Sequence, residues 1–121
     1  MTAAQKIAEA DKAFLFALAK AQKVYRDAVV EANKAFGVAE IEAEIAFEAT
    51  ITKAFKGRTI KSHEAYADSS NEPRTAFVAI IDKLRNICID TIAKARKTYY
   101  ADTAKAEATF TDALAPSPAN V

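Results

Sequence analysis

The sequence contains little that would break a helix. It has two glycines and three prolines in 121 residues, and two of the prolines, Pro116 and Pro118, lie in the last six positions. All-β and α/β domains need turn residues every ten or so positions, and this chain lacks them. Alanine, the best helix former because it loses no side-chain entropy, supplies 29 residues. The composition therefore predicts an all-α protein made of a few long helices.

The sequence also has one cysteine and no long apolar run. Cys88 cannot form an internal disulfide by itself and says little about the redox compartment. Acidic residues stand near the N-terminus, where a secretory signal would be apolar. Uncharged stretches such as 13–19 and 75–81 are far shorter than the roughly 20 residues that span a bilayer. We expect no signal peptide, no membrane span, and a location in the cytoplasm or in a virus particle.

The charge is nearly balanced, with 17 basic and 16 acidic residues and a net charge of +1. This balance gives no long-range attraction to nucleic acid or to an anionic membrane. One basic cluster, formed by Lys53, Lys56, Arg58 and Lys61, could touch phosphate, but aromatic residues do not interleave it. Its position favours a solvated helix end whose lysines oppose the helix dipole.

Catalytic and metal-binding patterns are missing as well. His63 is the only histidine, and no thiolate or carboxylate accompanies it at ligand spacing. Glu40, Glu44 and Glu48 share one helix face at i, i+4 and i+8, but a di-iron bundle would need Glu-x-x-His motifs. No phosphate-binding loop or nucleophile motif appears. We therefore expect a protein that is not an enzyme and that has no cofactor and no metal.

Apolar residues recur with a period of eleven along two parts of the chain. Steps of eleven from Phe14 and from Phe77 land on seven of the eleven aromatic residues. Up to Leu114, the positions four and seven residues after each step are also apolar, except Glu40 and Thr103. Eleven residues in three turns is close to the pitch of an ordinary α-helix, so such a stripe stays on one face. The pattern predicts hendecad packing, which is the eleven-residue form of coiled-coil packing.

The stripes and the breaks between them predict one helical-hairpin domain over residues 1–121. We expect helices at about 3–56 and 73–114, a connector at about 57–72 and an extended tail at 115–121. Pro73 suits the first turn of a helix because its missing N–H is not needed there. Gly37 costs about 1 kcal/mol relative to alanine and could mark a bend in the first helix. A connector of this length lets the second helix return antiparallel.

The stripe residues are the predicted packing and self-association residues. Cys88 belongs to them as a small core residue, which is more common than a reactive thiol on an apolar face. The full set is Phe14, Leu18, Tyr25, Val29, Phe36, Phe47, Ile51, Phe77, Ile81, Leu84, Cys88, Ile92, Tyr99 and Phe110. Further apolar residues fall outside the stripe, among them Val38, Ile41 and Ile45, which form a second stripe on the first helix. Because a helix with two apolar faces needs two neighbours, we expect a homo-oligomer, most simply a multi-helix bundle.

Glu40 interrupts the apolar stripe, and two interpretations remain open. In the first, it sets the register of the helices by pairing with Lys94, Arg96 or Lys97, as single polar core residues do in coiled coils. In the second, the helix bends at Gly37 and turns Glu40 to water.

These patterns favour a structural or assembly protein. We expect a self-associating helical rod that serves as scaffold or spacer in a larger complex, for instance a bacterial or viral (phage) particle, in which case its role would be virion assembly. Its expected partners are its own copies and other proteins of the assembly. The alternative is a small helical adaptor or inhibitor that docks an apolar stripe onto a partner protein.

Overall fold

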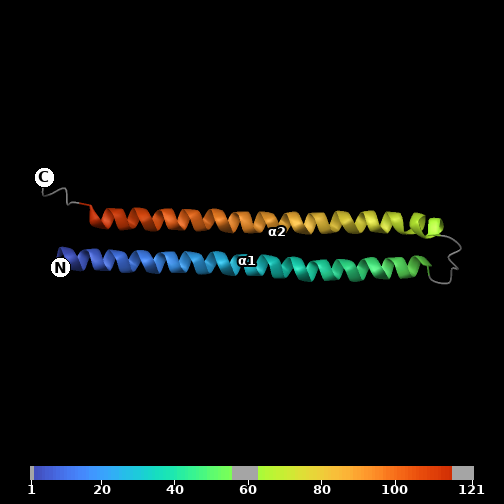
Figure 1. The fold of residues 1–121 in the computed structure, drawn as a ribbon, viewed down its shortest axis with the longest axis horizontal. Helices are drawn as coiled ribbons and strands as arrows, with labels where there is room; N and C mark the ends of the chain where they lie inside the picture. The colour runs from blue at the N-terminus through green and yellow to red at the C-terminus, as the bar shows by residue number, and fades with distance from the viewer. Residues whose placement is uncertain (1, 56–62, 116–121) are drawn as a thin grey trace. The chain divides into compact units, whose positions relative to one another are not determined.

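The chain folds into two long α-helices that pack against each other as a hairpin (Figure 1). The computed structural model describes the backbone of residues 2–55 and 63–115, and the side chains of residues 2–54 and 71–115. Helix α1 is Ala3–Phe55 and helix α2 is His63–Leu114. The described residues contain no strand. The predicted all-α hairpin is therefore confirmed.

Helix α1 begins with a reciprocal pair of capping hydrogen bonds. The Gln5 amide donates to Thr2 Oγ1 over 3.1 Å, and the Thr2 amide donates to Gln5 Oε1 over 2.8 Å. This is a capping box, which satisfies amide groups that have no partner within the helix. The sequence Thr-x-x-Gln thus fixes the start of α1.

Helix α1 continues without a break through Gly37. A Cβ atom at Gly37 would have no neighbour within 4 Å, so no close packing requires a glycine there. The helix absorbs the cost of about 1 kcal/mol because residues on both sides are strong helix formers. The helix is therefore not broken at this position.

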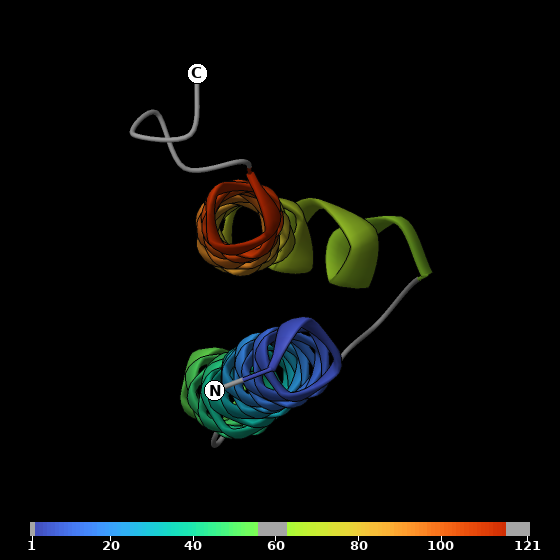
Figure 2. The same cartoon turned by 90° about the vertical axis from the view of Figure 1, so that its left-hand side faces the viewer.

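Helix α2 begins earlier than predicted. Its first residue is His63, so Pro73 lies inside the helix and most of the predicted connector is helical. Proline lacks the amide that would donate to the carbonyl four residues before it, and its ring crowds the preceding turn. Figure 2 shows the yellow-green first turns of α2 turned aside from the rest of the helix. A helix can therefore contain Pro73 by bending. The rest of the connector and the tail from residue 116 lie outside the described residues.

The helices form two compact units, each built from part of α1 and part of α2. The first unit comprises Met1–Val30 and Ile92–Val121, and the second comprises Glu31–Thr91. In the first unit the blue start of α1 lies beside the red end of α2 (Figures 1 and 2). The two segments of each unit are antiparallel.

Side-chain burial in these units is low. The only buried apolar residues among those described are Ala21, Ala32 and Ala106. The accessible surface of the chain is 9578 Å². A compact monomer of the same mass, 13.1 kDa, would expose about 6,400 Å². The hairpin by itself therefore leaves far more surface in water than a globular fold of this size.

Candidate functional site

The predicted packing residues lie between the helices of their own unit. All fourteen are half-buried, and none is fully buried or exposed. The structure thus places them on the side of each helix that the other helix covers. A role of these residues in self-association stays a prediction.

Among the described side chains, three aromatic pairs join the two helices. In the first unit the ring centres of Phe14 and Phe110 are 5.2 Å apart, and those of Tyr25 and Tyr99 are 5.5 Å apart. In the second unit the rings of Phe47 and Phe77 are 5.0 Å apart. The interplanar angles are between 31° and 40°. Such tilted contacts between rings add about 0.5–1.5 kcal/mol per pair beyond the burial of their area.

The pairs also define the register of the antiparallel segments. The step from Phe14 to Tyr25 advances eleven residues along α1, and the step from Phe110 to Tyr99 goes back eleven along α2. In the second unit, Phe47 lies two such steps after Tyr25 on α1, and its partner Phe77 lies two such steps before Tyr99 on α2. Side chains at equivalent positions of the pattern therefore meet.

Cys88 contacts the backbone of α1. Its Sγ atom lies 3.6 Å from the Ala32 carbonyl oxygen and 3.6 Å from Asn33 Oδ1, and its one hydrogen can be donated to either. The thiol is half-buried and free. These contacts are those of a small core residue, and among the described residues no group of histidine, cysteine and acidic side chains could hold a metal ion.

Glu40 is half-buried in the second unit. It lies seven residues before Phe47, so the register places it level with Leu84, seven residues after Phe77. The suggested partners, Lys94, Arg96 and Lys97, belong to the first unit. Among the described side chains the ion pairs are Lys23–Asp27 and Asp82–Arg85, each within one helix, so Glu40 forms none.

The remaining polar candidates show no assembled site in the described residues. Glu44, Glu48 and Lys53 are exposed. His63, placed by sequence in a charged loop, is instead the first residue of α2, and its side chain is outside the described residues. Most of the basic cluster, Lys56, Arg58 and Lys61, is outside them as well.

One face of the first unit carries tyrosine and arginine side chains. A groove of about 410 Å³ is lined by Gln22, Tyr25, Arg26, Val29, Val30 and Tyr99. The neighbouring Tyr25 side chain raises the pKa of Arg96 above its usual value. Because arginine is charged at any physiological pH, this shift does not create a pH switch.

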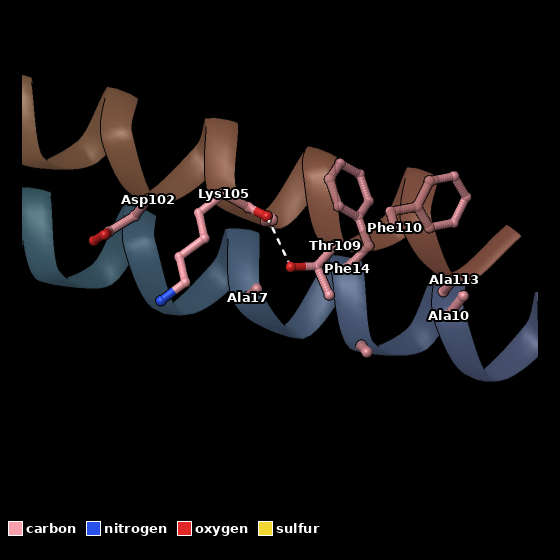
Figure 3. A pocket seen from close by; sticks show the side chains of 10 residues that line it. Ala10, Phe14, Ala17, Asp102, Lys105, Thr109, Phe110 and Ala113 are labelled. Atoms are coloured by element: carbon pink, nitrogen blue, oxygen red, sulfur yellow. Dashed lines mark hydrogen bonds between the residues drawn. The ribbon is translucent and has the colours of Figure 1, made fainter. Parts of the chain in front are cut away.

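A second groove of the first unit is lined mainly by alanine and phenylalanine. It has a volume of about 250 Å³ and lies beside the Phe14–Phe110 pair (Figure 3). Ala13 and Ala17, one residue before and three after Phe14, line it from α1, and Thr109 and Ala113 stand at the same positions around Phe110. Asp102 and Lys105 project at one end of this groove.

The second unit has the equivalent groove beside the Phe47–Phe77 pair. Its volume is about 140 Å³, and the positions one before and three after each ring are Ala46, Thr50, Ala76 and Ile80. In both units, we use the name alanine side for all positions that lie one residue before or three residues after a step of the eleven-residue pattern. In the first unit they are Ala13, Ala17, Val24, Ala28, Thr98, Asp102, Thr109 and Ala113. In the second unit they are Ala35, Ala39, Ala46, Thr50, Ala76, Ile80, Ile87 and Thr91.

The alanine side differs sharply in charge from the opposite flank of the same stripe. Asp102 is its one charged residue, although the chain is 27% charged. The opposite flank consists of the positions three before and one after each step, and it includes Arg26, Glu48 and Arg96. None of the alanine-side residues is among those predicted above. The signal that could have found them is this absence of charge at two fixed positions of the eleven-residue pattern.

Comparisons with known proteins found no match to a protein-family model, to a curated protein or to a solved structure. In the helical residues that the structure describes, no segment is long and apolar enough to cross a membrane. The fold therefore defines the chain as an all-α helical hairpin.

Proposed function

We propose that this chain is a non-enzymatic structural protein whose helical hairpins associate with one another to build a scaffold or spacer. The observation that carries the proposal is the exposure of fourteen large apolar residues, while the buried apolar residues among those described are three alanines. Phe16 is 73% exposed, and Val38, Ile41 and Ile45 on α1 are 51–62% exposed. Burying such residues is worth about 25 cal/mol per Å² of apolar surface, so association of copies is favourable.

The packing proposed for the assembly is hendecad packing in a multi-helix bundle. Its support is the eleven-residue spacing of Phe14 and Tyr25 on α1 and of Tyr99 and Phe110 on α2. A stripe of this period follows one face of a nearly straight helix over many turns. Straight helices suit a spacer because further copies can pack along their whole length.

The mass of the purified chain in solution tests this proposal. Sedimentation equilibrium or light scattering should give a defined multiple of 13.1 kDa, and dilution should lower both the mass and the helical circular dichroism. A chain that is monomeric and fully helical at every concentration would refute the scaffold function. It would favour the second candidate, an adaptor whose exposed residues bind a different protein.

A further inference from the structure

We infer that the alanine side of the first unit binds the alanine side of the first unit in a second copy of this chain, related to the first by a two-fold axis. This inference rests on the proposed self-association and specifies the surface that performs it.

The small side chains on this surface favour a helix as its occupant. Alanine residues let the axes of packed helices approach to the short end of the usual 8–10 Å range. The apolar groove is open beside Phe14 and Phe110, and Val24 on the same side is 51% exposed. Because α1 and α2 already cover each other's stripe, the helices of a second copy would pack on the alanine side of the unit.

Threonine adds little polarity to this surface. The Thr109 hydroxyl donates to the Lys105 carbonyl of its own helix over 2.9 Å (Figure 3). Thr50 and Thr91, at equivalent positions in the second unit, donate to the carbonyls of Ala46 and Ile87 over 2.9 and 2.8 Å. A hydroxyl that is satisfied within its helix leaves its methyl group for packing. These threonines therefore resemble alanine in what they offer to a neighbour.

The charges at the edge of the groove favour a copy of the same chain. Asp102 and Lys105 line it three residues apart, both are exposed, and neither forms an ion pair within the described residues. A two-fold interface places residue i against residue j and j against i. An axis passing between these two residues would bring Asp102 of each copy to Lys105 of the other, which satisfies both charges twice.

The area that the chain leaves exposed is sufficient for such an interface. The accessible surface exceeds that of a compact monomer of this mass by about 3,000 Å². A stable interface between two proteins needs only about 800 Å² from each partner. The excess of the whole chain is therefore several times the area that one partner of such an interface contributes.

Two variants of the full chain test which surface associates. Ala13→Glu places a charge in the groove, and Ala19→Glu places the same charge at an exposed position of α1 outside it. By sedimentation equilibrium we expect Ala13→Glu to weaken self-association at least tenfold and Ala19→Glu to change it less than threefold. Helical circular dichroism of both variants verifies that the hairpin still forms.

Charge reversal tests the two-fold arrangement. Asp102→Lys sets like charges against each other in both symmetric contacts, and so does Lys105→Asp. Each variant alone should associate several-fold more weakly than the wild type, more so at low salt than at high salt. An equimolar mixture of the two should recover wild-type association, because every contact then joins a lysine to an aspartate.

The possible failures are distinguishable. A wild-type chain that stays monomeric overturns the proposed function together with this inference, and leaves a different protein as the occupant. An oligomeric wild type that Ala13→Glu leaves intact overturns the inference alone. A mixture of the charge variants that associates no better than either one overturns the two-fold axis. In a Cys88→Ser background, an equimolar mixture of Thr98→Cys and Thr109→Cys should cross-link two copies, because an axis between Asp102 and Lys105 sets residue 98 of one copy against residue 109 of the other. A mixture of Thr98→Cys and Thr111→Cys should not cross-link.

Discussion

The two units use the same apolar pattern with different regularity. In the described part of the first unit, no glycine or proline interrupts either helix, and two aromatic pairs join them. The second unit contains Gly37, Pro73 and Glu40, and Cys88 occupies a position that is aromatic elsewhere in the pattern. Among the side chains that the structure describes in this unit, the aromatic pair Phe47–Phe77 joins the two helices. The comparison teaches that a long helix tolerates local defects where the stripe on either side stays intact.

The largest expected effect comes from removing one ring of a pair. Phe14→Ala in the first unit and Phe47→Ala in the second should each lower the free energy of unfolding by about 3 kcal/mol, the low end for phenylalanine because both rings are half-buried. Urea denaturation followed by circular dichroism measures this loss. Hydrogen exchange should locate it in the unit that carries the change.

Phe16→Ala is the matched control, because Phe16 is 73% exposed. At concentrations where the chain is monomeric it should change stability by less than about 0.5 kcal/mol. A loss as large as that of Phe14→Ala would mean that another part of the protein covers Phe16.

The next largest effect concerns the defect in α2. Replacing Pro73 with alanine should raise the free energy of unfolding by up to about 3 kcal/mol, because proline inside a helix is that much less favourable than alanine. The midpoint of thermal unfolding would report it, and Pro116→Ala, beyond the end of α2, should leave the midpoint unchanged. An unchanged midpoint in Pro73→Ala would place the start of the helix at Pro73, as the sequence alone predicts.

Glu40 is expected to have a smaller effect. Glu40→Leu should raise the free energy of unfolding by about 1 kcal/mol, since a half-buried carboxylate level with Leu84 is replaced by an apolar side chain. The exposed Glu44→Leu should change it little. If Glu40 sets the register of the assembly, the mass in solution or the melting temperature of Glu40→Leu would instead fall or become heterogeneous.

The smallest effect belongs to Gly37. Gly37→Ala should raise stability by about 0.5–1 kcal/mol, because the position is helical and the added Cβ meets nothing within 4 Å. The exposed Ala49→Gly should lower it by a similar amount. Weaker self-association of Gly37→Ala, despite a more stable hairpin, would show that another copy approaches this glycine closely.

Much of the fold could be predicted because helical periodicity is a local property. The eleven-residue spacing of Phe14, Tyr25 and Phe36 identifies the covered face of α1 without knowledge of α2. The start of α2 could not be predicted in the same way. Proline is compatible with the first turn of a helix and with the interior of a bent helix. The sequence alone favours the first turn for Pro73, because proline is common there.

The candidate surfaces were predicted only in part. The covered stripe and the exposed residues Val38, Ile41 and Ile45 follow from the sequence pattern. The ion-pair partners suggested for Glu40 do not agree with the structure. Lys94, Arg96 and Lys97 could face Glu40 only in a different alignment of the two helices. Sequence spacing within one helix carries no information about which residue of the other helix lies opposite.

The sequence by itself determined that this protein is helical, where α1 begins, and which stripe each helix turns to its neighbour, because hydrogen bonds and side-chain spacing within a helix extend over only a few residues. Only the tertiary structure decided that Phe14 meets Phe110 and Tyr25 meets Tyr99. It also decided that the alanine side forms open grooves. These features depend on the alignment of two antiparallel segments, which is fixed by contacts between residues far apart in the chain.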